Sequence, residues 1–478
     1  MTRSYQASMR KMSLGGITMN DSISIISSED RLPFISFFEK LHLFSNKIAF
    51  KSYETEWTYA NLVELIEKTG SVINLFSEKF ICLKIEHPVL FGATLFSVIL
   101  SGKVAVLGEI ETCDNNEVTI CDNDLHNITA ESKKCTIWKS DADIEAAPCV
   151  IVKSSGTTSV SKKVMLSQKN LMTEIITLTE LKLFTGDDIY LHILPFSHLF
   201  GLLGDLLLPL YVGAVVCFGN NNNIFDDMKC FNPTQMCLPP VALDSIIYLI
   251  DCSGCKSSVV GTSLNKIITG GADIKDTSVT ILKRYGIDII KAYGLTECSP
   301  CISVDFCEKR KHGSVGHILP CCDVKIINGE ITVAGDTVMV GYWNDFESTS
   351  KVIKNGRLYT GDLGSLDSDG YLFLAGRKTN LIVFDNGTKI VPEEVEKSIL
   401  SIPEITECVV VDNGSGKHIR VDIYIVVSKI EYESKISSCI HEILRKYCST
   451  EYVGNTIISD TPLKRNELGK IDRRFYRK

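Results

Sequence analysis

The sequence lacks a hydrophobic run long enough to cross a bilayer without interruption. Residues 89–100 are apolar, but a membrane helix needs about 20 such residues. The longer apolar stretch 191–218 is interrupted by Pro195, His198, Asp205 and Pro209. This pattern fits buried strands and helices of a water-exposed protein better than a membrane span. We therefore expect no transmembrane segment.

A strong excess of one charge is also missing. The 478 residues contain 50 Lys and Arg against 58 Asp and Glu, giving a net charge of −8, and no block of like charges occurs. This composition excludes a chain-wide surface for nucleic acid or anionic membranes. Repeats and low-complexity stretches are absent as well, which excludes collagen-like, coiled-coil and wholly disordered chains. The length predicts two or three domains.

Cysteine, by contrast, is abundant, and whether the cysteines form disulfides depends on the cellular compartment. Residues 1–28 lack the apolar core of a signal peptide, so the 18 cysteines are expected to be reduced thiols in a cytoplasmic protein. The spacings Cys252/Cys255 and Cys298/Cys301 are compatible with a zinc site. Buried or incidental thiols are the favoured interpretation. The second pair encloses a Ser-Pro and directly follows the 293–297 motif, which is explained below without zinc.

The pattern of strands and helices predicts an α/β protein. After a loose leader over residues 1–25, short apolar strands alternate with helices, as in 80–85, 88–100 and 103–107, which predicts a doubly wound, mostly parallel sheet. From residue 315 onward, short strands with Gly and Asn turns predict a small barrel or meander. The last 100 or so residues predict a compact α+β unit. It comprises helices at 392–400 and 432–447 and strands at 406–411 and 420–427.

A hydroxyl-rich loop follows the predicted strand at 149–153. It combines a glycine, a lysine and several hydroxyl side chains: Ser154, Ser155, Gly156, Thr157, Thr158 and Lys162. Exposed backbone N–H groups, hydroxyls and a cation are what a polyphosphate needs. A solvated Ser/Thr turn is the alternative for this loop taken alone. It is not the GxxxxGK[ST] phosphate loop, because Lys162 lies six residues after Gly156.

Five motifs in order resemble those of the adenylate-forming enzymes, which include acyl-CoA synthetases, fatty-acyl-AMP ligases, adenylation domains and luciferases. The first is the loop 154–164. The others are Tyr-Gly-Leu-Thr-Glu at 293–297, Thr-Gly-Asp at 360–362, Gly-Arg at 376–377 with the following 386–396 segment, and Gly-Lys-Ile at 469–471. Five motifs in the family's order, spanning 154–471, make coincidence implausible.

The resemblance implies a role for each matching residue. A large N-terminal domain, 26–378, would hold ATP and an acyl pocket, and a mobile C-terminal lid, 379–478, would carry the catalytic lysine. The catalytic group would comprise Lys470, Thr296 and Glu297, with Glu297 holding Mg²⁺, and the 154–162 loop would bind phosphate. The adenine and ribose site would comprise Gly271, Ala272, Tyr293, Gly294, Asp362 and Arg377. The acyl pocket would include His198, Phe200, Gly201 and Gly270, with Thr379 as the hinge and Gly387 in the thiol-tunnel loop. A packed core histidine is the alternative for His198, and a surface charge is the alternative for Glu297 or Lys470.

The sequence departs from the family's pattern inside the phosphate loop. Ser159, Ser161 and Lys163 stand where the family usually has Gly, Pro and Gly, and Thr379 stands where its hinge is commonly Asp or Lys. A serine at a position that needs a positive φ restricts the backbone. We therefore expect a less mobile loop.

The substrate and acceptor follow from the same resemblance. The segment 195–202 is apolar with one histidine and lacks the acidic residue that pairs an amino acid's ammonium, so a medium- or long-chain fatty acid is the first expectation and an aryl acid the second. Only eight residues follow Lys470, so we expect no fused carrier domain after it. The acceptor would then be the thiol of coenzyme A or the phosphopantetheine of a separate carrier protein. Activation of an amino acid for a peptide or polyketide synthetase, and a nucleotide-binding pseudoenzyme, remain the alternatives.

Overall fold

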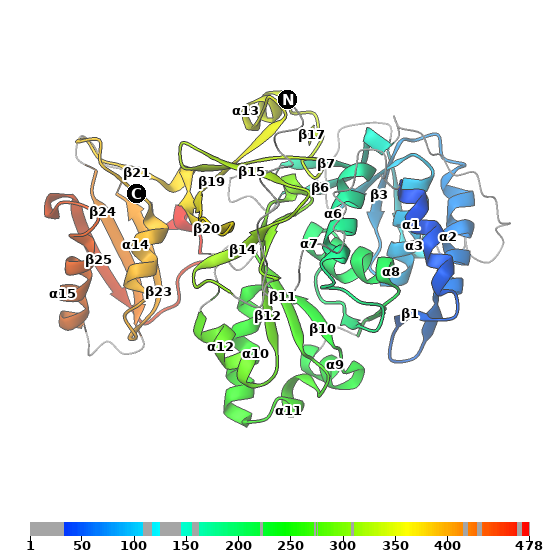
Figure 1. Ribbon diagram of the computed structural model, residues 1–478, viewed down its shortest axis with the longest axis horizontal. Coiled ribbons are helices and arrows are strands. Elements are labelled where there is room, and N and C mark those ends of the chain that lie inside the picture. The colour runs from blue at the N-terminus through cyan, green and yellow to red at the C-terminus, as the bar shows by residue number, and fades with distance from the viewer. Residues whose placement is uncertain are drawn as a thin grey trace.

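The computed structural model describes most of the chain. The described residues are 33–108, 117–124, 145–154, 162–219, 223–271, 274, 276–306, 310–413, 419–427, 433–465 and 471–477. The expected leader lies outside them, as do Ser155 to Thr158, Ser159, Ser161, Ala272 and Lys470. Figure 1 shows two sheet-and-helix layers packed side by side, with the C-terminal part at one end.

The first layer is a six-stranded sheet. Its order is β17-β7-β6-β4-β3-β5, and β3 to β6 are parallel while β7 and β17 are antiparallel to their neighbours. The strands are β3 (Phe80–Lys84), β4 (Val104–Leu107), β5 (Glu117–Cys121), β6 (Pro148–Lys153), β7 (Lys163–Ser167) and β17 (Gly341–Tyr342). The nearby helices are α1 (Phe34–Leu41), α2 (Tyr59–Ile73), α3 (Pro88–Leu100) and α6 (Gln168–Glu180). Helix α3 starts with Pro88 at its first turn and is buried along its length, which explains why its sequence is apolar on all sides.

The second layer is a 14-stranded sheet whose middle is parallel. Strands β9, β8, β10, β11 and β12 run parallel, and β1 pairs with β9 at one side. These strands are β1 (Ile48–Lys51), β2 (Glu56–Thr58), β8 (Ile189–Leu191), β9 (Val215–Cys217), β10 (Gln235–Leu238), β11 (Lys266–Gly270) and β12 (Asp288–Gly294). Helices α9 (Ile224–Phe231), α10 (Pro240–Ser253), α11 (Ser257–Val260) and α12 (Asp276–Arg284) cover one face. The alternation of strands and helices confirms the predicted doubly wound α/β fold.

The other face of this sheet carries part of the apolar stretch 191–218, which was predicted to form buried strands and helices. Three short helices, α7 (Leu199–Gly201), η3 (Leu202–Leu207) and α8 (Leu208–Val212), pack there in the large core shared with the first layer. None of the described helices is long and apolar enough to cross a membrane.

The strands expected as a small barrel or meander continue the second sheet. They are β13 (Cys301–Val304), β14 (Ser314–Ile318), β15 (Asp323–Ile327), β16 (Glu330–Ala334), β19 (Arg357–Leu366) and β20 (Tyr371–Arg377), with the short β18 (Ile353–Lys354) beside β19. They are antiparallel and run as one path, β15-β16-β19-β20-β14-β13, into β12. In the described residues, the predicted barrel is therefore the antiparallel end of the large sheet. Although β20, β14 and β13 separate β19 from β12 along this path, a hydrogen bond of 2.8 Å joins Tyr293 of β12 to Asp362 of β19.

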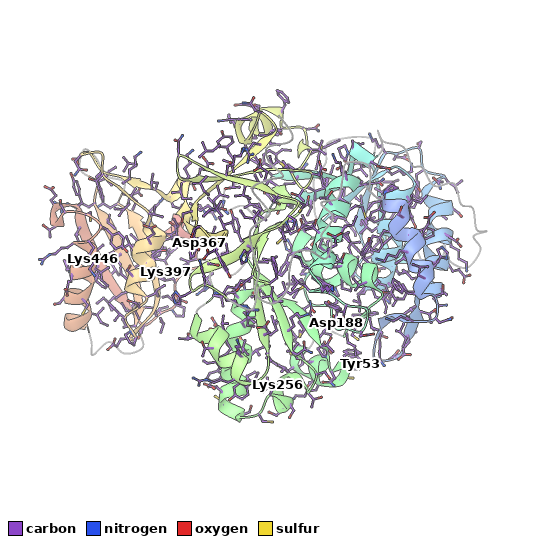
Figure 2. The ribbon with its side chains drawn as sticks, viewed as in Figure 1. Tyr53, Asp188, Lys256, Asp367, Lys397 and Lys446 are labelled. Atoms are coloured by element: carbon purple, nitrogen blue, oxygen red, sulfur yellow. The ribbon has the colours of Figure 1, made fainter. Side chains whose placement is uncertain are left out.

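The C-terminal part has a core of its own. It contains β21 (Ile382–Val383), β22 (Lys389–Ile390), β23 (Ile405–Asp412), β24 (Val421–Val427), β25 (Val453–Ser459), α14 (Pro392–Ile399) and α15 (Glu433–Leu444). The predicted order of helices and strands is confirmed, with ends within three residues of those predicted. Figure 2 shows Asp367, just after β19, on the side of the central sheet that faces α14, which carries Lys397.

A buried ion pair fastens the chain end to this C-terminal part. Two nitrogens of Arg473 lie 2.6 and 2.5 Å from the two carboxylate oxygens of Glu396, and a third contact of 2.8 Å reaches the carbonyl of Val410. The amide of Val410 donates to the same carboxylate at 2.6 Å. Burial raises the pKa of Glu396 to about 7, although Arg473 opposes the shift.

Arg473→Met should therefore destabilise the C-terminal part by about 3–5 kcal/mol, because an uncompensated carboxylate stays buried. Glu396 already has a pKa of about 7 in the folded protein, and without the cation this pKa rises further. The loss relative to the wild type should therefore vanish below about pH 7, where the folded carboxyl is protonated in both proteins, and grow as the pH rises above that value. Hydrogen exchange of the β23 and β24 amides across this pH range measures the effect.

Arg474→Met is the matched control, because Arg474 pairs with Asp472 in an exposed ion pair. It should leave the exchange of these amides unchanged. Equal effects of the two variants would show that the Arg473 pair does not hold the chain end.

Candidate active site

A buried carboxylate stands where three strands meet. Asp362 is 6% exposed, and its β19 position is directly opposite Arg377 on β20. The hydroxyl of Tyr293, at the end of β12, donates to one oxygen of Asp362 at 2.8 Å, and Nε of Arg377 lies 2.6 Å from the other. Burial, and then the charge of Asp362, raise the pKa of Tyr293 well above its usual value, so its proton stays available for this bond. Tyr293, Asp362 and Arg377 come from motifs far apart in the sequence and were predicted to bind ribose and adenine. The structure brings these three residues together.

The local sequence explains how Asp362 is held. Gly361 adopts φ of +74°, a left-handed conformation that favours glycine. The Thr360 hydroxyl donates to the carbonyl of Ile331 at 2.7 Å and accepts the Asp362 amide at 3.0 Å. The amide of Gly361 donates to Glu330 at 3.0 Å. Thr360 and Gly361 therefore set the backbone conformation that positions the carboxylate of Asp362.

A second polar group joins the two layers. Glu297 and Thr296 lie in η4 (Thr296–Cys298), which follows β12, and both are half-buried. The Tyr342 hydroxyl donates to Glu297 at 2.9 Å, and the Lys162 ammonium lies 4.5 Å from the centre of the Tyr342 ring. Burial, followed by the charge of Glu297, raises the pKa of Tyr342. One tyrosine thus contacts a cation through its ring and a carboxylate through its hydroxyl.

The hydroxyl-rich loop lies on a hairpin. Strands β6 and β7 pair as antiparallel neighbours up to Lys153 and Lys163. Beyond them, the Ser154 amide donates to the Lys162 carbonyl at 2.7 Å, and the Ser154 hydroxyl accepts the Lys162 amide at 3.1 Å. Both ends of the loop are therefore fixed next to Tyr342, and Ser155 to Thr158 lie outside the described residues.

The predicted glycines have different reasons to be glycine. A Cβ at Gly294 would lie 1.8 Å from the Pro300 carbonyl oxygen, and one at Gly270 would lie 2.4 Å from that of Ala292. Gly271 adopts φ of +85° and faces open space. Neighbouring backbone therefore excludes larger residues at 294 and 270, while Gly271 is exposed beside them and its successor Ala272 is not described.

The predicted acyl-pocket residues lie around α7. His198 is the exposed N-cap residue of α7, and Phe200 is half-buried. A Cβ at Gly201 would lie 2.6 Å from the Pro195 carbonyl oxygen. Close packing against its own loop therefore explains why residue 201 is a glycine, without the need for a ligand.

The predicted hinge and thiol-tunnel residues belong to the C-terminal side. Thr379 lies in η5 (Lys378–Asn380), two residues after Arg377. Gly387 lies in the turn between β21 and β22 with φ of +81°. Lys470 falls outside the described residues.

Sequence motifs did not reveal Tyr342. Its place follows from β17, which leaves the second sheet to pair with β7 of the first. A signal in the sequence exists only in hindsight, as the short Gly-Tyr-Trp segment 341–343.

Comparisons with known proteins agree with this geometry. A family model described as AMP-binding enzyme matches residues 97–343, more than half of the chain. The chain belongs to the AMP-binding enzyme family. ATP-bound MatB from Rhodopseudomonas palustris has the same fold as this AMP-binding enzyme, with a TM-score of 0.80 over 92% of this chain and 98% of that one at 21% identity.

Curated relatives of this AMP-binding enzyme are named CoA ligases. It is 29% identical over 340 residues to an indoleacetate–CoA ligase of Aromatoleum aromaticum, covering 68% of this chain and 66% of the relative. It is also 29% identical over 320 residues to a long-chain-fatty-acid–CoA ligase of Bacillus subtilis, covering 62% and 55%. The chain thus spans between about half and two thirds of the length of these relatives.

Asp362→Asn should weaken AMP binding by about 10- to 100-fold, because hydrogen bonds to a charged acceptor contribute about 1.5–3 kcal/mol. Isothermal titration of AMP measures this change. Asp367→Asn is the matched control, since Asp367 lies just after the same strand and contacts Lys311 at 2.6 Å. Unchanged AMP affinity in the Asp362 variant, with an unchanged melting temperature, would exclude Asp362 from the nucleotide site.

Proposed function

We propose that this AMP-binding enzyme uses ATP to convert a carboxylic acid into an acyl-adenylate and then transfers the acyl group to a thiol. The observation that carries the proposal is the placement of the Tyr293–Asp362–Arg377 group and the Glu297–Tyr342–Lys162 group in one chain of this family. The first group suits the nucleoside, and the second, next to the hydroxyl-rich loop, suits its phosphates. The names of the curated relatives support the same reaction.

In the first step, a carboxylate oxygen of the acid attacks the α-phosphorus of ATP. The new O–P bond forms as the bond from the α-phosphorus to the bridging oxygen breaks, and pyrophosphate leaves with the electron pair. Charge grows on the phosphate oxygens, so positioning and cationic stabilisation carry most of the catalysis. Lys162, Thr296 and the loop from Ser154 to Thr158 are proposed to bind these oxygens. Lys470 is proposed to act on the oxygens around the reacting phosphorus.

Asp362 is proposed to hold the ribose. Both of its oxygens are acceptors that can receive ribose hydroxyls, and Arg377 and Tyr293 keep the carboxylate charged and oriented. Gly271, Ala272 and Gly294 are proposed to line the adenine beside Tyr293. Since Gly271 is exposed with free space around it, the base can approach its backbone.

Glu297 fits a magnesium ion. Mg²⁺ is usually held by one or two carboxylates and by substrate phosphates, and the Tyr342 bond engages one oxygen of Glu297 while the other carboxylate oxygen remains for an ion. No group of three or more candidate ligands occurs among the described residues, which suits a magnesium ion held mainly by phosphates better than an all-protein site. When bound, Mg²⁺ would neutralise charge on the phosphates.

In the second step, the thiolate attacks the acyl carbon, the bond from that carbon to the phosphate oxygen breaks, and AMP leaves. We propose coenzyme A as the acceptor, because the curated relatives are named CoA ligases, with a carrier-protein phosphopantetheine as the alternative. Domains at 26–378 and 379–478, with rotation about Thr379 between the steps, are part of the proposal. The separate C-terminal core and the position of Thr379 in η5 support it.

For the acid, we propose a medium- or long-chain fatty acid, with an aryl acid as the second candidate. His198, Phe200, Gly201 and Gly270 are proposed to line the acyl site. The α7 to α8 segment is rich in leucine and packs on the inner face of the second sheet, which suits an apolar chain.

ATP–pyrophosphate exchange with a panel of acids tests the proposal. We expect exchange that depends on the acid and on Mg²⁺, followed by release of AMP when coenzyme A is added. Tight AMP binding without exchange for any acid would instead indicate a nucleotide-binding pseudoenzyme.

Glu297→Gln should lower the exchange rate by about 100-fold and raise the Mg²⁺ concentration needed, because the amide keeps the shape but not the charge. AMP affinity should change little. Glu347→Gln is the control, since Glu347 is an exposed residue of α13 (Phe346–Val352) that pairs with Lys351. An unchanged Mg²⁺ requirement in the Glu297 variant would exclude Glu297 as the partner of the metal.

A further inference from the structure

Three polar side chains, fully buried between the two layers, carry atoms that make no hydrogen bond among the described residues. Tyr190, Asp205 and Gln235 are each 0% exposed. Among the described residues, four of their atoms make no hydrogen bond: the Tyr190 hydroxyl, Asp205 Oδ1, and both Oε1 and Nε2 of Gln235. Buried polar atoms are nearly always bonded in folded proteins, so each such group calls for an explanation.

These side chains share one place. Tyr190 and Gln235 are directly opposite each other in the parallel pair of β8 and β10. Tyr190 and Cys237 belong to the core between the two layers, whereas Leu191 and Met236 belong to the core on the far side. Since side chains alternate along a strand, Gln235 faces inward with Cys237. Asp188, labelled in Figure 2, lies directly before β8 and marks this end of the sheet.

Asp205 reaches the same place from the helical layer above. It lies in η3, and Gly204 before it packs so closely that a Cβ there would lie 2.5 Å from the Cys237 sulfur. One oxygen of Asp205 accepts the amides of Ile193 and Leu194, both at 3.0 Å. The carboxylate is therefore fixed by Oδ2, which also lies 3.5 Å from Nδ1 of His192, while Oδ1 makes no hydrogen bond to nitrogen or oxygen among the described residues. After burial itself, the charge of Asp205 and a hydrogen-bonding contact between the two side chains raise the pKa of Cys237.

The group lies along the strands from the proposed acyl site. In the register of β10 and β11, Gln235 is opposite Lys266, four residues before Gly270, which is about 13 Å at the usual rise of a strand. Gly270 and Ile268 alternate onto the inward face with Gln235 and Cys237. Phe200 lies 3.9 Å from the Cβ position of Gly204, so the acyl wall continues into the segment that carries Asp205.

We propose that Tyr190, Asp205 and Gln235 receive a hydroxyl group at the end of the substrate acid that is far from its carboxylate. The inference rests on the proposed acid activation. A hydroxyl both donates and accepts, so it can donate to Asp205 Oδ1 and accept from Gln235 Nε2 or the Tyr190 hydroxyl. A plain hydrocarbon end would leave all four atoms unpaired.

Matched acids test the proposal by ATP–pyrophosphate exchange. The pairs are decanoate with ω-hydroxydecanoate, dodecanoate with ω-hydroxydodecanoate, and cinnamate with para-hydroxycinnamate. In at least one pair, the hydroxylated acid should have a kcat/KM about 100-fold higher or more, because a site built to bond a hydroxyl discriminates strongly against its absence. The pair that shows the preference identifies an aliphatic or an aromatic source of the hydroxyl.

Two variants assign the preference to these residues. Tyr190→Phe and Gln235→Leu should each lower the ratio of the two kcat/KM values at least tenfold, with the plain acid gaining and the hydroxylated acid losing. Tyr59→Phe is the control, because Tyr59 is equally buried but donates to the Ala214 carbonyl at 2.7 Å. It should leave the ratio unchanged.

Three outcomes overturn the inference. Equal rates within every pair would show that the group holds buried water only, while acid activation itself would stand. A preference that survives both variants would place the hydroxyl elsewhere. No exchange with any acid, in protein that binds AMP, would overturn the proposed function and this inference together.

Discussion

The pairing of β17 with β7 is the constraint on which the phosphate side of the site depends. The chain leaves the second sheet after β16, adds β17 to the edge of the first sheet and returns as β19. The amides of Val340 and Trp343 donate to Met165 and Lys163, at 3.0 and 2.8 Å, and so fix the crossing. This pairing helps to hold the Tyr342 hydroxyl on Glu297 and its ring beside Lys162. A short strand therefore joins the end of β12 to the loop between β6 and β7.

A side-chain anchor strengthens the same crossing. The Asn170 amide on α6 donates to the carbonyls of Asp336 and Val338, at 2.7 and 2.9 Å, and Lys169 pairs with Asp336 at 2.7 Å. Asn170 also completes the N-terminal cap of α6 with Ser167. The helix that follows β7 thus holds the incoming segment at the place where β17 pairs. Local helix capping and the geometry of the site are coupled through one residue.

Much of the fold and of the site could be predicted from the sequence, because the signals lie in local patterns or in motifs that follow a fixed order. Alternating apolar strands and helices fixed the α/β class, and the motifs around Tyr293, Asp362 and Arg377 pointed to residues that do lie together. Tyr342 could not be found, since its role depends on a strand pairing between distant segments. Tyr190 and Gln235 lie in short apolar strands and look like core, and Asp205 looked only like an interruption of an apolar stretch.

The buried carboxylates of this protein differ in their hydrogen-bond and charge partners. Arg473 pairs with Glu396, and Tyr293 and Arg377 bond to Asp362, so neither carboxylate needs a further partner to be stable. Glu174 is fully buried with one oxygen on the Cys301 amide and the other without a bond, but burial raises its pKa well above the usual value. A neutral acid carries no charge that must be balanced.

Asp205 differs from Glu174 because it does not stand alone. Its free oxygen shares one buried face with the unbonded hydroxyl of Tyr190 and the unbonded amide of Gln235, so donors and acceptors occur together. A single unpaired atom costs stability and is tolerated. Several complementary ones in one place would be removed at little cost by apolar residues, unless a ligand with matching polarity uses them. The number and kind of unpaired atoms, more than burial of a charge, therefore separate a structural carboxylate from one that awaits a substrate.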